Sequence, residues 1–501
     1  MKYSYRTTVY IVIILSTVLR LFLGGQLEFG NDEVYYWLYA KYPDISHFDH
    51  PPFVGFFIQF FTLDLFFDSE LAIRLAAIIP ASINMYVLFL IGKLIKNELT
   101  GLITVLLYNI NIYALIISGT FILPDAPLLF FWLLSFYFLL QSLPYTASSK
   151  TKKYMLVAFA CIGCAIYSKY QGVYLLFGIG LYVLLVNRKW LKEWSFYLVF
   201  LFPILALSLI YYWNYSNDFI SYKFHNNRVS LFSLSFNKDS FLREVLGQFI
   251  YNNPYIFVMI IIMIVALIKK KFQFEKKLLW MFLFFSFPLI FTTIYLSLFR
   301  DTLPHWSGIA YVTLLPFLAV FISDKKNIHQ KLMKGFAFFS VLLILVSIEI
   351  NKGWFLPVNN NQQEKTKVGK KDAIMDLYGW EQASQKVSHY LRDNKLTELP
   401  IISDKWFPAS HIDYYIARPN NMHVYGVGEL PSIHKYYWIN SLRPSIENKK
   451  EFLYITDGRN YREPSSVYKD NFDKYNLLQT FPITRNEKTV KFVFVYRLTK
   501  L

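Results

Sequence analysis

The sequence predicts a polytopic α-helical membrane protein with a C-terminal extracytoplasmic α/β domain. Three observations lead to this fold class. Hydrophobic residues make up 55% of the 501 residues and charged residues only 17%, a composition outside the usual range of water-soluble domains. Apolar segments of membrane-spanning length recur as far as residue 350. Beyond that point charge rises, and the apolar runs shorten to the length of strands.

Membrane-spanning segments are identified by length, because roughly 20 largely apolar residues are needed to cross a bilayer. About eleven segments meet this criterion. They are 8–25, 72–92, 100–117, 125–142, 154–168, 171–187, 196–213, 254–268, 278–298, 307–323 and 335–350. The first has no small-residue cleavage site after it and leads directly into a polar motif, so we expect a retained helix and not a signal peptide.

Basic residues cluster in alternate connections between these segments, and the other connections are poor in Lys and Arg apart from the long one around 214–253. With the N-terminus inside, the inner connections hold Lys93, Lys96, Lys150, Lys152, Lys153, Arg188, Lys189, Lys192, Lys269, Lys270, Lys271, Lys276, Lys277, Lys325, Lys326, Lys331 and Lys334. Because basic loops face the cytoplasm, we expect a cytoplasmic N-terminus in the cell inner (plasma) membrane. This distribution also explains the formal charge of +17 without a nucleic-acid partner.

An odd number of spans places residues 351–501 on the extracytoplasmic side. We expect two domains, a transmembrane domain over 1–350 and a small α/β domain over 351–501. In the second domain, residues 378–396 have helical spacing, whereas 401–403, 452–456 and 488–496 have the pattern of strands.

The unusual polar residues all fall on the predicted outer side. They are Asp32, Glu33, Asp49 and His50 after the first span, Asp125 at the start of the fourth, Lys169 between two spans, and Arg300, His305 and Trp306 in FRDTLPHW. Charged groups cost several kcal/mol to bury in or near lipid, so a cluster of them indicates a function or compensating interactions. We interpret it as an active site.

Structural roles for these residues stay open at this point. Asp125 follows a proline and would cap the next helix, while Asp49 would only orient His50. Lys169 would extend to the membrane interface, and His305 with its neighbouring tryptophan would anchor the chain there.

Acids and cations together on an outer membrane face suit group transfer from a phosphate-linked lipid. A carboxylate removes a proton from an acceptor hydroxyl, while Lys, His or Arg stabilises the leaving phosphate. Glycosyl transfer passes through an oxocarbenium-like state, which a second carboxylate such as Asp125 or Glu33 would stabilise. Tyr35 and Tyr36 suit stacking on a sugar and equally an interfacial aromatic belt. Adjacent acids with His would also accept a divalent metal, although no spacing matches a defined metal motif.

The ordered motifs NDEVYYW, FDHPP, PDAPLLFFW, SKYQG, LPHW, YGWEQAS and WFPASHIDYYIA resemble the bacterial polyprenyl-phosphate-dependent glycosyltransferases of the GT-C class. These are relatives of the dolichyl-phosphate-mannose protein mannosyltransferases (glycosyltransferase family 39 type) and of the lipid A aminoarabinose transferases. The resemblance spans nearly the whole chain. It implies a GT-C catalytic domain over 1–350 that moves a sugar from a polyprenyl phosphate, such as undecaprenyl phosphate, to a glycan, lipid or protein acceptor with inversion.

The resemblance also implies roles for individual residues. Asp32 is the expected general base, with Glu33 beside it, and Asp125 is the second acid. The basic residue before the proline pair contacts the lipid phosphate in aminoarabinose transferases, and His50 stands at that position in place of the usual Lys. The further candidates are Lys169, His305 and Arg300 for the donor phosphate, and Tyr35, Tyr36, Asp49 and Trp306 for substrate. The donor sugar stays open.

Two other classes of function compete with the enzyme. A transporter of a lipid-linked or sugar substrate would place ionisable residues near the bilayer midplane, often in repeated halves; here the acids cluster at one face and no repeat is evident. A structural or assembly protein would keep its function when Asp32 is replaced by Asn.

Overall fold

The computed structural model describes residues 4–229, 235–355, 364–370, 372–469 and 471–500. The chain divides into two compact units. The helical unit comprises Met1–Gly24 and Pro43–Leu342, and the mixed unit comprises Gly25–Tyr42 and Leu343–Leu501. The expected division into functional domains at residue 350 stays a prediction, and the structure adds that a short early segment belongs to the mixed unit.

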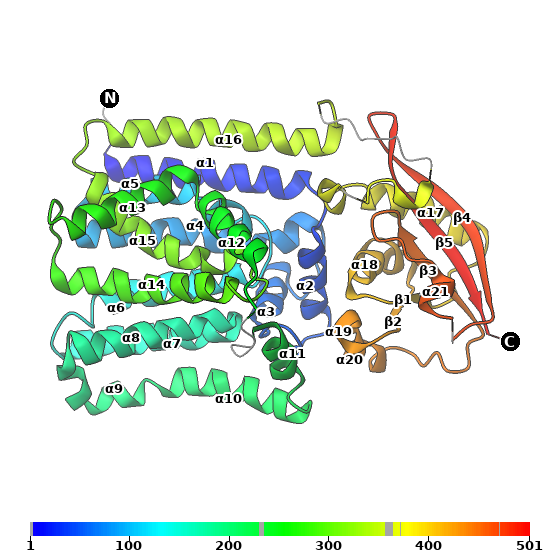
Figure 1. Ribbon diagram of the computed structural model, residues 1–501, viewed down its shortest axis with the longest axis horizontal. Helices are drawn as coiled ribbons and strands as arrows, with labels where there is room; N and C mark the ends of the chain where they lie inside the picture. Colours follow the sequence, from blue (N-terminus) through cyan, green and yellow to red (C-terminus); the bar gives the residue numbers. More distant parts are fainter. Residues whose placement is uncertain (1–3, 230–234, 356–363, 371, 470, 501) are drawn as a thin grey trace. The chain divides into compact units, whose positions relative to one another are not determined.

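Long helices run side by side through the helical unit (Figure 1). The helices are α1 (Tyr5–Gln26), α3 (Phe53–Thr62), α4 (Glu70–Ile95), α5 (Glu98–Ile110), α6 (Asp125–Leu140), α7 (Ser149–Ser168), α8 (Val173–Leu185), α9 (Trp194–Leu198), α10 (Leu201–Ser216), α11 (Ile220–Val229), α12 (Lys238–Tyr251), α13 (Pro254–Ile268), α14 (Lys276–Ser297), α15 (Gly308–Ile322) and α16 (Ile328–Lys352). Short helical turns also occur, at η1 (Tyr113–Ile117), η2 (Tyr170–Gly172), η3 (Arg188–Lys192) and η4 (Pro304–Ser307).

Every predicted span falls on one of these helices, some with an adjoining helical turn, and α16 continues beyond the helical unit from Leu343. Among the described residues, six helical segments are long and apolar enough to cross a membrane, and the pair α12 and α13, bent by 99°, raises the number to seven. Other predicted spans, such as those on α5 and α6, coincide with shorter apolar helices. The multi-pass membrane class is confirmed, while the number of eleven spans stays a prediction.

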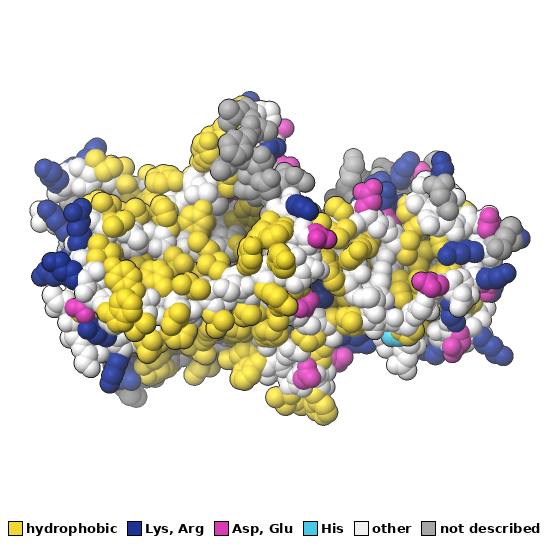
Figure 2. Space-filling model, turned by 90° about the horizontal axis from the view of Figure 1, so that it is seen from below, with side chains coloured by type: hydrophobic (Ala, Val, Ile, Leu, Met, Phe, Trp, Pro, Cys, Tyr) yellow, Lys and Arg dark blue, Asp and Glu magenta, His cyan; other side chains and the backbone are white. Residues whose placement is uncertain are grey.

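The basic connections gather at one end of the helical unit. Lys96 donates to Asp324 at 2.7 Å and so joins the α4–α5 connection to the α15–α16 connection. Lys152, near the start of α7, pairs at 2.6 Å with Glu193, which lies between η3 and α9. Figure 2 shows Lys and Arg at the left end of this unit, beside a hydrophobic face. This arrangement agrees with the alternation used to predict the orientation, which itself stays a prediction.

The mixed unit is built on a five-stranded sheet with the order β2-β1-β3-β5-β4. The strands are β1 (Ile401–Ser403), β2 (Val424–Gly426), β3 (Glu451–Asp457), β4 (Lys474–Arg485) and β5 (Lys488–Thr499). β1 pairs in parallel with β2 and β3, whereas β5 pairs antiparallel with β3 and β4. The helices are α2 (Asn31–Lys41), α17 (Trp380–Asp393), α18 (Trp406–His411), α19 (Leu430–Ile433), α20 (Tyr436–Ser441) and α21 (Pro464–Val467), with turns η5 (Lys365–Lys367), η6 (Ala373–Asp376), η7 (Ile412–Ala417) and η8 (Arg418–Asn420).

The predicted α/β class of the C-terminal region is confirmed. The expected helix is α17, whose buried residues Trp380, Ala383, Val387 and Leu391 recur at helical spacing. The three expected strands are β1, β3 and β5. The sequence did not predict β2, which has three residues, or β4, whose first seven residues are all at least partly exposed and show no clear alternation.

Candidate active site

The Asp125 carboxylate is the centre of a buried polar cluster in the helical unit. The hydroxyl of Tyr113 donates to Oδ1 at 3.0 Å, and Nζ of Lys169 donates to Oδ2 at 2.7 Å. The side chains of Asp125 and Lys169 are each 3% exposed. His305 interacts electrostatically with both of them. The structure thus brings together three residues, Asp125, Lys169 and His305, that were selected from separate sequence motifs.

Local backbone structure explains why these residues meet. Asp125 is the first residue of α6, where the helix dipole favours a negative charge. Lys169 ends α7 in an extended conformation, with φ −159° and ψ 142°. The chain then turns closely past the end of α7, because a Cβ on Gly172 would lie 2.5 Å from the backbone N of Ile166. The SKYQG motif is therefore a tight turn that directs Lys169 to Asp125.

Tyr113 was not predicted from the sequence. It lies in η1, a π-helical turn of the kind often found at functional sites. Its ring packs directly on the start of α15, since a Cβ on Gly308 would lie 2.3 Å from the ring atom Cγ. Within the apolar run YALII a single tyrosine gives no signal of a polar role, which is why sequence reasoning missed it.

A cavity of about 480 Å³ lies in the helical unit, and we call it the His50 cavity. It is lined by His50, Tyr170, Gln171, Tyr174, Tyr222, Leu289, Thr292, Thr293, Leu296 and Trp306. Tyr170 directly follows Lys169, and Trp306 directly follows His305. The Asp125 cluster and the His50 cavity therefore draw on the same two chain segments, Lys169–Gly172 and η4.

The loop that carries Asp49 and His50 is held by neighbouring helices. Nε1 of Trp213 on α10 donates to Asp44 at 2.8 Å. The ring of Phe48 packs against Phe224 of α11 with centroids 4.6 Å apart. Asp49 and His50 are both partly buried, so the DHPP motif sits in a defined environment before α3 begins.

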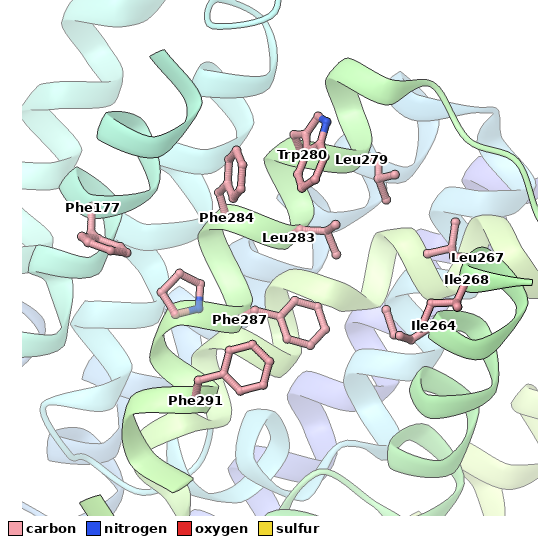
Figure 3. Close-up of a pocket in the computed structure, with 11 residues that line it drawn as sticks. Phe177, Ile264, Leu267, Ile268, Leu279, Trp280, Leu283, Phe284, Phe287 and Phe291 are labelled. Carbon is pink, nitrogen blue, oxygen red and sulfur yellow. The ribbon is translucent and has the colours of Figure 1, made fainter. Parts of the chain in front are cut away.

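A second cavity, of about 640 Å³, is lined only by apolar side chains and is called the α14 groove (Figure 3). Its lining comes from α8, α13 and α14 and comprises Phe177, Ile264, Leu267, Ile268, Leu279, Trp280, Leu283, Phe284, Phe287, Pro288 and Phe291. Residues three or four apart on a helix are neighbours. Phe177 of the groove is thus next to Tyr174 of the His50 cavity, and Pro288 is next to Thr292.

Asp32 and Glu33 lie in the first turn of α2, in the mixed unit. Glu33 is buried, and its Oε2 accepts from the backbone N–H of Gly30 at 3.0 Å. Glu33 therefore caps its own helix. Asp32 is exposed and lies in the first turn of α2, beside the free N–H groups of the helix start. The catalytic roles of both acids stay predictions.

Tyr35 and Tyr36 of α2 are buried, with 1% and 5% of their surface exposed. The ring of Tyr35 lies 4.9 Å from that of Trp406, and the ring of Tyr36 lies 5.3 Å from that of Tyr39, between centroids. Both therefore serve the packing of α2, and their expected contact with substrate stays a prediction.

Arg300 lines a different cavity, of about 710 Å³, together with Lys238 and Asp301. It is not among the residues that line the His50 cavity, and its expected contact with the phosphate stays a prediction. Within the described ranges, no three His, Cys, Asp or Glu side chains form a group suited to hold a metal ion.

Glu244 of α12 is a buried acid that sequence reasoning did not select. Its carboxylate accepts from Nε2 of Gln248 at 2.7 Å and from the hydroxyl of Thr302 at 2.6 Å. Gln248 in turn accepts from the hydroxyl of Tyr311 at 2.7 Å. Thr302 lies just before η4, so this network ties α12 to the segment that carries His305. No recognisable motif surrounds Glu244, which lies in the long connection between two predicted spans.

Comparison with known proteins adds a family match over part of the chain and a shared fold. Residues 49–213 match the model of the family described as dolichyl-phosphate-mannose-protein mannosyltransferase. The structure of ArnT from Cupriavidus metallidurans bound to undecaprenyl phosphate is similar, with a TM-score of 0.60, 12% identity and 98% of each chain covered. The apo structure of the same ArnT has a TM-score of 0.56, 13% identity and 98% coverage of each chain. No curated protein sequence matches this chain. At such identities the structural match shows a shared fold.

Proposed function

We propose that this chain is a membrane glycosyltransferase of the GT-C class, that it uses a polyprenyl-phosphate donor, and that it transfers the donor sugar to an acceptor hydroxyl with inversion and with Asp32 as general base. The observation that carries the proposal is that the His50 cavity, which is lined in part by hydrogen-bonding side chains, and the apolar α14 groove use neighbouring residues of α8 and α14. A polyprenyl phosphate has the same two parts, a charged head and an apolar tail.

The donor fits this pair of cavities by its chemistry. His50 and Gln171, both in the lining of this cavity, carry N–H groups that can donate hydrogen bonds to a phosphate. From Thr292 to Trp280, α14 extends over roughly 18 Å at about 1.5 Å per residue. Over that length the groove offers only hydrocarbon and aromatic surface, which suits an isoprenoid chain. We therefore assign the phosphate to the His50 cavity and the chain to the α14 groove.

In the proposed reaction the acceptor oxygen attacks the anomeric carbon as the bond from that carbon to the phosphate oxygen breaks. Asp32 takes the proton of the acceptor hydroxyl, and the polyprenyl phosphate leaves with the bonding electrons. General-base catalysis of this kind contributes about 10²–10⁴-fold. Attack opposite the leaving group inverts the anomeric centre.

We assign the Asp125–Lys169 pair an electrostatic role at the donor phosphate. Alone, the Asp125 carboxylate would repel an incoming phosphate, and Lys169 neutralises it at 2.7 Å. Lys169 and His305 also lie directly before Tyr170 and Trp306, two residues that line the His50 cavity. We propose that this pair sets the electrostatic environment of the phosphate and of the oxocarbenium-like transition state.

We further propose that the protein lies in the cell inner membrane with its basic connections cytoplasmic. This follows from the positive-inside rule and from the gathering of these connections at one end of the helical unit. The active site and the mixed unit are then extracytoplasmic.

The general base is tested with Asp32→Asn, which keeps the size of the side chain and removes the basic oxygen. We expect transfer to fall by about 10²–10⁴-fold, with unchanged expression and unchanged affinity for undecaprenyl phosphate. Asp393→Asn, at an exposed acid of α17 in the same unit, is the matched control. Normal transfer by Asp32→Asn would refute the assignment of the base.

The identities of the donor sugar and of the acceptor need a separate experiment. Mass spectrometry of membrane glycolipids, glycans and glycoproteins from cells with and without this protein identifies both.

A further inference from the structure

The segment Gly25–Tyr42, called here the Asp32 segment, forms a compact unit with residues 343–501 although more than 300 residues separate them in the chain. Hydrogen bonds at its start and at its end, and one from within α2, join it to that distant region. These contacts bear on the role of residues 343–501, for which the sequence offers no function.

Glu28 anchors the start of the segment. Its two carboxylate oxygens accept from the backbone N–H groups of Trp380 at 2.5 Å and Glu381 at 3.2 Å. These are the first two residues of α17, whose free N–H groups and dipole favour a carboxylate. Burial raises the pKa of Glu28, and the positive charge of buried Lys491 opposes this rise.

Phe29 is held by its backbone on both sides. Its N–H donates to the hydroxyl of Tyr415 at 2.9 Å, and its carbonyl lies 3.0 Å from Nε2 of His411. Burial lowers the pKa of His411 to about 3, so the ring is neutral at pH 7 and donates from Nε2 to the carbonyl. Phe29 is itself fully buried. The chain two residues before α2 therefore has a defined position.

The remainder of the segment is held by residues of the C-terminal region. The backbone N–H of Lys435 donates to the Tyr35 hydroxyl at 3.4 Å, and its ammonium donates to the carbonyl of Tyr42. Nε of Arg443 donates to the hydroxyl of Tyr42 at 3.1 Å. Arg443 is paired with Asp413, and both side chains are 1% exposed.

We infer that residues 343–501 serve catalysis as a positioning domain for the helix that carries Asp32. The inference rests on the proposed role of Asp32 as base. Contacts before, within and after α2 over-determine its place, and a displacement of about 1 Å at a reacting group costs on the order of 10²-fold in rate. The positioning residues are Glu28, His411, Tyr415, Lys435 and Arg443.

The test uses Tyr415→Phe and Glu28→Gln in the full-length membrane protein. Tyr415→Phe removes one acceptor and keeps the ring, whereas Glu28→Gln removes the charge at the start of α17. We expect kcat for transfer to fall by about 10–100-fold in each. The affinity for undecaprenyl phosphate stays unchanged, and amide hydrogen exchange over residues 31–41 becomes faster. Tyr437→Phe, at a tyrosine that is 57% exposed, is the matched control, and Glu28→Asp should restore part of the rate.

The possible outcomes separate this inference from the proposed function. Unchanged kcat and unchanged exchange in both variants would overturn the positioning role. So would an equal loss of donor affinity, because it would give the domain a part in donor binding. Normal transfer by Asp32→Asn would overturn the base assignment and leave the exchange result standing. Thermal unfolding of each variant shows whether it is folded, and Tyr415→Phe is the milder change if Glu28→Gln does not fold.

Discussion

At the scale of residues, the Asp125–Lys169 pair is a matched set of charges with almost no access to water. Removing one partner of such a pair leaves a buried, uncompensated charge and destabilises by about 3–5 kcal/mol. We expect that loss in Asp125→Asn and in Lys169→Met. The double variant should recover most of it, because neither charge then remains. The free energies of unfolding of the wild type, the two single variants and the double variant form a double-mutant cycle. Thermal unfolding in detergent, with and without undecaprenyl phosphate, measures them.

The control for this cycle is the pair Lys152–Glu193, whose side chains are 42% and 32% exposed. Pairs of this kind contribute at most about 1 kcal/mol, so Lys152→Met should change stability little. If the double variant at Asp125 and Lys169 is as unstable as the sum of the single variants, the two charges are not coupled and the interpretation fails.

His411 makes the stability of the mixed unit depend on pH. Its pKa is about 3 in the folded protein, below the ordinary value of 6.5. Between these values the unfolded chain binds a proton that the folded chain does not, so the free energy of unfolding falls as pH falls from 6.5 to 3, by at most about 1.4 kcal/mol per pH unit. His411→Phe should reduce this slope. His389→Phe, at a 76% exposed histidine, should leave it unchanged; equal slopes in all three proteins would contradict the expectation.

Individual site residues were predictable where polarity contrasted with the surroundings. Asp125, Lys169 and His305 stood out because charge at the edge of an apolar span is costly. Tyr113 did not stand out, since tyrosine is common in membrane segments. Glu244 was missed for the opposite reason: it lies in a polar connection, where one more acid attracts no notice, and its burial follows from the packing of α12 on η4.

At the scale of elements, α12 and η4 meet at Gly247. A Cβ at this position would lie 2.2 Å from Cγ of Pro304. We expect Gly247→Ala to force η4 away, costing about 1–3 kcal/mol by overpacking, and to lower transfer because His305 and Trp306 follow Pro304. Gly335→Ala is the control, because a Cβ there meets nothing within 4 Å. The test compares the unfolding midpoints and transfer rates of Gly247→Ala and Gly335→Ala. If the two variants have equal midpoints and equal rates, η4 tolerates the added methyl group and the expectation is wrong.

Secondary-structure elements were predictable where the spacing of apolar residues along a short stretch of sequence identifies them. Residues 380–393 alternate buried and exposed faces with helical spacing, and the long apolar runs are helices as expected. The 99° bend between α12 and α13 was not foreseen. Neither was α3, since FVGFFIQFFT is shorter than a span and follows two prolines. Length and composition do not identify such helices; their place depends on tertiary contacts.

At the scale of the whole molecule, the proposed orientation has a direct test. Single cysteines at Lys326 and Asn394, both exposed, are introduced after Cys161 and Cys164 have been replaced by Ala. In intact cells we expect a membrane-impermeant maleimide to label Asn394→Cys at once and Lys326→Cys only after the membrane is opened. The reverse order would place the basic end outside and overturn the proposed topology.

The sequence could predict the class of the whole molecule but not its division into units. Hydropathy and charge are read along the chain, and they separate residues 1–350 from the rest. The Asp32 segment joins the other unit through Glu28, Phe29 and Tyr42, whose partners lie far along the chain, and no local pattern reports such pairing.

The long separation between the Asp32 segment and its anchors also determines the order in which they appear during protein synthesis. Tyr35 and the residue that donates to its hydroxyl are 400 positions apart. At roughly 5–20 residues per second, synthesis of that interval takes roughly 20–80 s. The Asp32 segment therefore leaves the ribosome early, and it can complete its hydrogen bonds to the anchoring residues only after residue 435 has been synthesised. A product terminated before residue 411 would keep the helices of the helical unit and lack the anchors of α2, so the proposed base would not be held in place.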